Sequence, residues 1–274
     1  MGSVAILFDA FKCTGCRGCQ VACKQWNDLE AEITRNTGSY QNPPRLSAKT
    51  WLTMRFNEIE RNGDGVAWAF GRWACMHCVH PACVSACPVG ALYKTPEGPV
   101  LWDKERCIGC RYCMIACPFE IPTFEWEKGL FDGARILKCT FCADRLGAGI
   151  QPACVHTCPS GALKFGDRDE LIAEAETRIR SQPDRYLQHV YGKDETGGTS
   201  LLYISHVPFE DLGLPTLGTT PIQDRAEDSM FATPWAIIGL VAGLSGIAWV
   251  VRRREEMIRR KGQSTEQGDR EAPS

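Results

Sequence analysis

The sequence has 274 residues, a nearly balanced formal charge of −2, and sixteen cysteines that all lie between Cys13 and Cys158. The balanced charge excludes the polybasic surface of a nucleic-acid-binding protein, so no nucleic acid is expected as a partner. The first residues, MGSVAILFDAFKC, show no basic region and no cleavage site, which disfavours a secreted disulfide scaffold and favours bound metal.

The first predicted element is a strand over residues 4–9, which leads into the first cysteine motif. This motif has the spacing C-x2-C-x2-C-x3-C, and a short helix is predicted over residues 21–26; its members are Cys13, Cys16, Cys19 and Cys23. A tight loop with cysteines three apart can wrap three corners of a cubane iron–sulfur cluster, whereas the fourth cysteine points toward a second cluster. The spacing therefore predicts clusters that occur in pairs.

An insertion at 31–69 separates this motif from the next and carries no chemical motif. We expect it to be irregular in structure. Its tryptophans Trp51 and Trp68, with Trp73 just beyond, are expected to serve packing and partner contacts, as is common for this residue type.

Three further motifs follow, and each ends in Cys-Pro. The second comprises Cys75, Cys78, Cys83 and Cys87, the third comprises Cys107, Cys110, Cys113 and Cys117, and the fourth comprises Cys139, Cys142, Cys154 and Cys158. Short flanking strands are predicted over 90–95, 99–103 and 162–166, and a helix over 114–118. The tripeptide Gly-Ala-Leu recurs at 90–92 and 161–163, which indicates an internal repeat.

Zinc is the chemical competitor for these cysteines, because Cys-x2-Cys pairs also build structural zinc sites. Such a zinc site does not require the closely spaced third and fourth cysteines of each motif, so the spacing favours four [4Fe–4S] clusters. Because sixteen cysteines match sixteen coordination sites, we expect no ligand among His77, His80 and His156, which lie inside the motifs. Positive charge beside a cluster would raise its potential, and basic residues near the motifs are Lys12, Arg17, Lys24, Arg111 and Lys138.

The C-terminal part is predicted to be an extended arm at 171–230, with a helical stretch near 169–181, followed by a membrane helix at 231–251. The membrane segment contains no charge, and helical residues in that number span about 31 Å, close to the thickness of a bilayer core. Thr233 and Pro234 predict its start, and a buried core helix is the alternative. Basic residues in the tail at 252–274 place the C-terminus in the cytoplasm and the cluster domain in the periplasm; the opposite orientation is the competing one.

The order of the motifs suggests how they pair. The second and third are close neighbours along the chain and form a natural two-cluster module, which leaves the first and fourth to form another. The predicted fold is α+β, with two interlocked bacterial-ferredoxin-like two-cluster modules, an irregular insertion and arm, and one C-terminal transmembrane helix. The predicted domains are an outer module at 1–30 and 130–170, the insertion at 31–69, an inner module at 70–129, the arm at 171–230, the transmembrane helix at 231–251 and the tail at 252–274.

This arrangement resembles the four-cluster ferredoxin subunits of molybdopterin oxidoreductases, and most closely the iron–sulfur (β) subunit of membrane-bound formate dehydrogenases. The resemblance covers nearly the whole chain, including KCTGCRGCQVACKQWNDL at 12–29, CMHCVHPACVSACP at 75–88, CIGCRYCMIACPFEIP at 107–122 and KCTFCADRLGAGIQPACVHTCPSGALKFG at 138–166. It implies four ligand sets. They are Cys13, Cys16, Cys19 and Cys158; Cys23, Cys139, Cys142 and Cys154; Cys75, Cys78, Cys83 and Cys117; and Cys87, Cys107, Cys110 and Cys113.

The same resemblance implies an electron relay without a substrate site of its own. Electrons would pass from a molybdenum or tungsten bis-pterin catalytic subunit to a membrane cytochrome b-type subunit that reduces quinone. The chain would be a single-pass protein of the inner (cell) membrane, in contact with lipid. Alternatives are the same relay in a polysulfide, dimethyl sulfoxide or nitrate reductase, and a zinc-stabilised scaffold protein.

Overall fold

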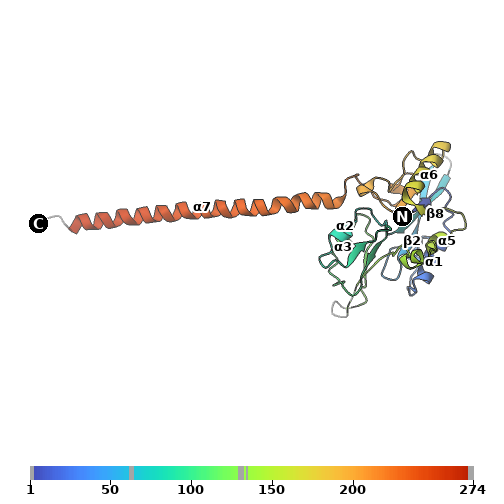
Figure 1. Cartoon of the computed structure of the whole chain (residues 1–274), viewed down its shortest axis with the longest axis horizontal. Coiled ribbons are helices and arrows are strands. Elements are labelled where there is room, and N and C mark those ends of the chain that lie inside the picture. The colour runs from blue at the N-terminus through green and yellow to red at the C-terminus, as the bar shows by residue number, and fades with distance from the viewer. Residues whose placement is uncertain (1–2, 62–64, 129–132, 134, 271–274) are drawn as a thin grey trace. The chain divides into compact units, whose positions relative to one another are not determined.

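The computed structural model describes residues 3–61, 65–128, 133 and 135–270, without the side chains of 225–230 and 260–270. The chain divides into an N-terminal unit, residues 1–223, and a C-terminal unit, residues 224–274. The N-terminal unit contains all sixteen cysteines, and Figure 1 shows that it is made of short helices and strands.

A three-stranded sheet forms one side of the N-terminal unit. Strand β1 (Val4–Asp9) pairs antiparallel with β8 (Leu163–Asp167) and parallel with β9 (Leu201–Ile204). Side chains alternate across β1, so Ala5 and Leu7 pack against helix α6 (Arg168–Ser181), while Ile6 and Phe8 join the core around the cysteine loops. The strands predicted at 4–9 and 162–166 and the helical stretch near 169–181 are therefore present.

A long hairpin covers the second side of the core. Strands β2 (Leu52–Arg61) and β3 (Gly65–Ala74) pair antiparallel over ten residues each. The expectation of an irregular insertion is wrong for this part, because residues 52–61 and 65–74 form regular structure. The expected arm is also more ordered than predicted, since its strand β9 completes the sheet beside β1.

The inner cysteine motifs are framed by two short hairpins. Strand β4 (Leu92–Lys94) pairs with β5 (Val100–Trp102), and β6 (Thr123–Phe124) pairs with β7 (Ile136–Leu137). Short helices occur in or directly after the motifs: α1 (Gly18–Trp26), α2 (Ala82–Ser85), α3 (Tyr112–Ala116), α4 (Ala143–Gly147) and α5 (Ala153–His156). The 3-10 turns η2 (Glu195–Gly197) and η3 (Glu210–Leu212) follow. The recurring order of loop, helix and strand agrees with the predicted two-cluster modules.

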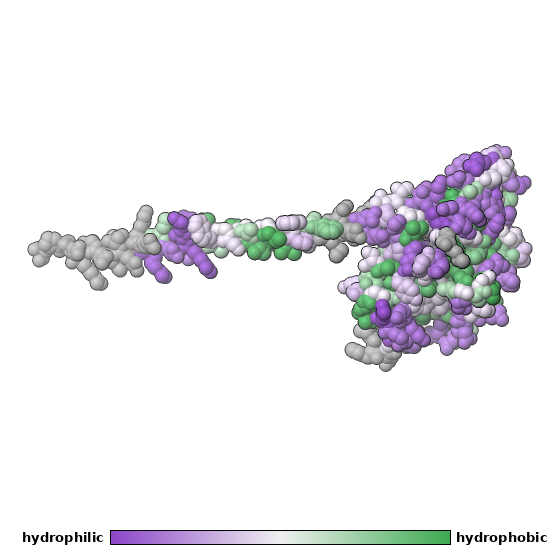
Figure 2. Space-filling model, in the orientation of Figure 1, coloured by the Kyte–Doolittle hydropathy of each residue, from purple (hydrophilic) through white to green (hydrophobic). Residues whose placement is uncertain are grey.

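The C-terminal unit consists of helix α7 (Ile222–Arg270). Its segment Phe231–Arg259 is long and apolar enough to cross a membrane, with a mean hydropathy of 1.9. The apolar side chains appear in Figure 2 as a green stretch of this helix, followed by a purple, hydrophilic one. The most apolar part of this segment is not buried, which argues against a core helix. The predicted helix start at Thr233 is wrong, because α7 begins earlier and Pro234 lies inside it.

Candidate iron–sulfur site

The cysteine loops adopt backbone conformations that turn N–H groups inward. In the first motif Gly15 has a φ of +64° and Arg17 a φ of +61°, and in the third motif Gly109 and Arg111 have φ values of +68° and +65°. Residues with positive φ in such turns let successive N–H groups converge and bind anions. A side chain at Gly15 would also meet the ring of Phe70, since an added Cβ would lie 2.6 Å from it. The first and third motifs therefore share one loop geometry.

The first group of cysteines joins the two ends of the N-terminal unit. Cys13, Cys16 and Cys19 line one pocket together with Cys158 from the fourth motif. Burial is the main cause that raises the pKa of the Cys13 thiol to about 11, and the charge of Cys158 contributes to this rise. Sγ of Cys19 lies 3.5 Å from Sδ of Met54 on the hairpin.

A second group forms around Cys23, the last cysteine of the first motif. Burial raises the pKa of its thiol well above the ordinary value, and the next causes are the charges of Cys139, Cys154 and Cys142. Cys158 of the fourth motif thus lies in the first group, and the other three cysteines of that motif lie beside Cys23. This is the exchange that the motif spacing predicts.

The inner motifs form the other two groups in the same manner. After burial, the pKa of Cys78 is raised by the charges of Cys75, Cys117 and Cys83. The pKa of Cys113 is raised to about 12 by burial and then by Cys107, Cys110 and Cys87. The four groups coincide with the four sets that the resemblance implies, while ligation itself stays a prediction.

Neighbouring groups approach one another in a row. The charge of Cys154 in the second group raises the pKa of Cys19 in the first. The charge of Cys75 in the third group likewise raises the pKa of Cys139 in the second. The charge of Cys113 in the fourth group raises the pKa of Cys83 in the third. The two terminal groups each contain one exposed cysteine, Cys16 and Cys110, whereas every cysteine of the middle groups is buried or half-buried.

The donor set fits cubane clusters. Among the described residues, no group of three or more His, Cys, Asp or Glu side chains could hold a single metal ion, as a zinc site would require. A cubane is wider, because each of its four thiolates binds a different iron. Backbone N–H groups already point at sulfur, from Ala91 to Cys87 Sγ at 3.2 Å and from Phe141 to Cys139 Sγ at 3.3 Å. Such hydrogen bonds tune cluster potentials.

Lys138 and Arg72 are the two most deeply buried cations among the described residues. Lys138, 1 % exposed, donates from Nζ to the carbonyl oxygens of Val100 and, at 3.1 Å, of Cys139. Arg72, 3 % exposed, lies on β3 with Nη2 3.8 Å from Cys154 Sγ. Burial opposes its charge, but the charges of Cys154 and other nearby groups raise the pKa of Arg72 above its ordinary value. Sequence reasoning missed Arg72, although it is the one charged residue in the strand sequence GVAWAFGRWA.

The other basic residues beside the motifs have different partners. Arg17 lies over the Phe56 ring at 4.6 Å, and Arg111 lies over the Phe124 and Trp126 rings. Lys24 Nζ donates to the carbonyl of Lys49 at 2.8 Å. These cations bind to aromatic rings and backbone, so of the five basic residues singled out from the sequence, Lys138 is the buried one.

His77 is buried beside the third group, and its ring is neutral. Its Nδ1 accepts a hydrogen bond from the backbone N–H of Val100 at 2.9 Å, so Nε2 carries the hydrogen. Nε2 has no partner among the described residues. Burial, and then the charge of Lys138, lowers the pKa of His77 well below its ordinary value. The Nε2–H group of His77 is therefore available to donate a hydrogen bond near a cluster.

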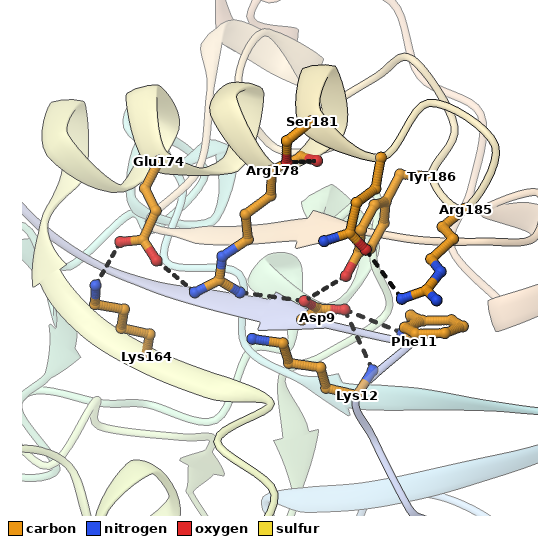
Figure 3. A network of polar contacts seen from close by, with 10 residues as sticks. Asp9, Phe11, Lys12, Lys164, Glu174, Arg178, Ser181, Arg185 and Tyr186 are labelled. Carbon is orange, nitrogen blue, oxygen red and sulfur yellow. Dashed lines mark hydrogen bonds and ion pairs between the residues drawn. The ribbon is translucent and has the colours of Figure 1, made fainter.

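The first cysteine loop is anchored by the carboxylate of Asp9 at the end of β1. Asp9 is fully buried and accepts hydrogen bonds from the backbone N–H groups of Phe11 and Lys12. It also accepts from Arg178 Nη1 at 3.1 Å and from the Tyr186 hydroxyl at 2.9 Å (Figure 3). Helix α6 and the segment after it are thereby tied to the start of the first motif.

Comparisons with known proteins agree with this geometry. Two family models, both described as a 4Fe-4S dicluster domain, match residues 12–91 and 66–168. The nitrate-inducible formate dehydrogenase iron–sulfur subunit of Escherichia coli (strain K12) is 44% identical over 206 residues, 74% of this chain and 68% of that protein. The formate dehydrogenase-O iron–sulfur subunit of the same strain is 42% identical over 206 residues, 74% of this chain and 67% of the relative. The Hydrogenase-2 operon protein HybA of Escherichia coli O157:H7 is 35% identical over 285 residues, 92% and 85% of the two chains.

The fold and the cysteine groups define a protein with two 4Fe-4S dicluster modules that transfers electrons. The chain belongs to the family of formate dehydrogenase iron–sulfur subunits. Its sixteen cysteines fit four [4Fe–4S] clusters, as predicted.

Proposed function

We propose that the four cysteine groups hold their clusters as a single row, so that electrons enter at one exposed end and leave at the other. The observation that carries this proposal is the succession of neighbouring thiols, Cys19 to Cys154, Cys139 to Cys75, and Cys83 to Cys113. Exposure of Cys16 and Cys110 at the two ends supports it, because partners can approach there. The clusters, when bound, accept and release single electrons.

The ligand sets that we propose are the four groups described above. Cys13, Cys16, Cys19 and Cys158 hold the first cluster, and Cys23, Cys139, Cys142 and Cys154 hold the second. Cys75, Cys78, Cys83 and Cys117 hold the third, and Cys87, Cys107, Cys110 and Cys113 hold the fourth. The shared pocket of the first group and the mutual charge effects within the others support these sets.

The partners that we propose are a molybdenum or tungsten bis-pterin subunit that oxidises formate and a cytochrome b-type membrane subunit that passes electrons to quinone. The 44% identity to a formate dehydrogenase iron–sulfur subunit supports this assignment. Helix α7 anchors the chain in the inner membrane. The basic residues after its apolar segment favour a cytoplasmic C-terminus and periplasmic clusters.

A second candidate is the same relay beside a hydrogen-oxidising subunit. The match to the Hydrogenase-2 operon protein HybA covers 92% of this chain, whereas the matches to the two formate dehydrogenase subunits cover 74%. The higher identity of the formate dehydrogenase subunits favours formate.

Purification of the tagged chain from its native membranes, together with its bound subunits, tests these proposals. We expect a brown complex whose EPR signals of reduced [4Fe–4S] clusters develop on addition of formate. Reduction by hydrogen and not by formate would establish the second candidate. A colourless preparation that contains zinc would overturn the relay itself, because zinc has no redox chemistry in proteins.

A further inference from the structure

Arg72 is a buried cation without a conventional counter-ion. Its side chain is 3 % exposed, and its Nε and Nη1 have no hydrogen-bond partner in the described part of the chain. Its remaining nitrogen, Nη2, lies 3.8 Å from Cys154 Sγ, and no carboxylate within the described ranges forms an ion pair with it. Burial of an unpaired charge is strongly destabilising, so a buried guanidinium requires an anion.

Lys138 provides a contrast within the same molecule. It is buried to a similar degree, but its ammonium donates to two carbonyl oxygens, of Val100 and Cys139. The hydrogen-bonding capacity of Lys138 is therefore partly satisfied by the protein, whereas two nitrogens of Arg72 have no hydrogen-bond acceptor among the described residues.

Cysteine sulfurs of the first two groups are among the charges that act on Arg72. Cys154 and Cys139 belong to the second group and Cys19 to the first, and the charge of each acts on Arg72. The position of Arg72 is fixed, because β3 pairs with β2 opposite Met54 and the Tyr203 hydroxyl donates to the Arg72 carbonyl at 2.7 Å. The guanidinium therefore lies at the junction of these two groups.

We propose that Arg72 is the counter-charge for the two clusters of the outer module and raises their reduction potentials, most strongly that of the cluster held by Cys23, Cys139, Cys142 and Cys154. Reduction adds one electron to a cluster, and a fixed positive charge beside it favours the reduced form. The charge effect is strong because little water lies near to screen it. This inference rests on the ligand sets proposed above.

The test compares three variants of the intact complex by EPR-monitored redox titration. Arg72→Gln and Arg72→Met remove the charge, and Arg72→Lys keeps it. The matched control is Arg55→Gln on the neighbouring strand β2, because the Arg55 guanidinium lies over the Trp73 ring at 3.9 Å and no cysteine charge acts on it. A Cys142→Ser variant identifies the signal of the second cluster.

We expect both neutral variants to shift the midpoint of the second cluster to more negative potential, and that of the first to a lesser extent. The other midpoints, and all midpoints in Arg72→Lys and Arg55→Gln, should remain at their wild-type values. Loss of clusters in the neutral variants, with all clusters and potentials retained in Arg72→Lys, would also support the role of the charge.

Two results would overturn the inference. One is a neutral variant that contains all its clusters at unchanged potentials. The other is cluster loss in Arg72→Lys as well, which would show that the shape of Arg72 matters and not its charge. A failure of the proposed four-cluster ligation can be told apart from a failure of this inference, because wild-type protein would then lack four [4Fe–4S] signals.

Discussion

Nine of the sixteen cysteine thiols are harder to ionise than thiols in water, because burial away from solvent raises their pKa. Burial raises the pKa of Cys19, Cys83 and Cys139 to about 12. Neighbouring thiols add to this effect, since each negative charge disfavours the next. Metal binds the thiolate form, so the protein without its clusters holds protons that cluster binding must displace.

We therefore expect cluster retention to depend on pH. Burial raises the pKa of Cys13, Cys117 and Cys142 to about 11, so at neutral pH these sulfurs are protonated in the absence of metal, and cluster binding strengthens as pH rises toward about 11. Iron bound after reconstitution at several pH values measures this. Iron binding that does not change between about pH 6 and about pH 9 would contradict the expectation.

The Asp9 network leads to a stability prediction. Arg178→Met removes a hydrogen bond from a fully buried carboxylate, and we expect a loss of about 1–3 kcal/mol in the free energy of unfolding. Arg180→Met on the same helix is the control, because Arg180 is 67 % exposed in its side chain and its ion pair with Glu176 contributes little. Denaturant titration of the two variants measures the difference. Equal stability of both would show that the Asp9 contact contributes nothing.

At the scale of elements, the β2–β3 hairpin supports the site through close packing. Its Phe70 ring covers Gly15 in the first cysteine loop, and its Gly71 lies against the turn η3. A Cβ at Gly71 would lie 2.4 Å from the carbonyl oxygen of Leu212, a backbone atom that cannot rotate away. The hairpin therefore presents both a small residue to a neighbouring turn and the charge of Arg72 to the cysteines.

Gly71→Ala is accordingly expected to destabilise the N-terminal unit by about 1–3 kcal/mol, since the backbone of η3 must shift. Gly147→Ala serves as the control, because this glycine lies in helix α4 and an added Cβ meets nothing within 4 Å. Thermal unfolding of the two cluster-loaded variants provides the measurement. A Gly71→Ala protein as stable as Gly147→Ala would mean that η3 moves at no cost.

The sequence predicted the elements that are local to the cysteine motifs. The strands at 4–9 and 162–166 and the grouping of the motifs follow from short apolar runs and from spacing. The hairpin was missed because its alternating pattern is interrupted by charged residues, as in LTMRFNEIER. Strand β9 was missed because its pairing with β1 joins residues almost 200 positions apart, and four residues carry no local signal of such a partner. The role of Arg72 follows from burial, which depends on this tertiary packing.

The whole molecule combines a unit that contains the cysteines with a helix that is long and apolar enough to cross a membrane. The N-terminal unit, residues 1–223, contains every cysteine, and the apolar segment lies in the C-terminal unit. Each unit has its own internal contacts, so we expect the core of the first to persist when the second is removed.

We expect a chain that ends at Gln223 to retain all its clusters and to lose its affinity for lipid. Flotation of the purified chain with liposomes, together with iron analysis, measures both properties. Leu240→Arg, which places a charge within the apolar segment, should weaken flotation without loss of iron. Flotation of the shortened chain at the full-length level would contradict the assignment of α7 as the anchor.

The parallel pairing of β1 with β9 has a consequence for biosynthesis. The first strand leaves the ribosome early, but its neighbours in the sheet are residues 163–167 and 201–204. The first cysteine group likewise waits for Cys158, whereas the two inner groups are complete once Cys117 has been made. If the proposed ligand sets hold, we expect iron to reach the inner motifs of a nascent chain first, and the outer motifs only after Cys158 has been translated.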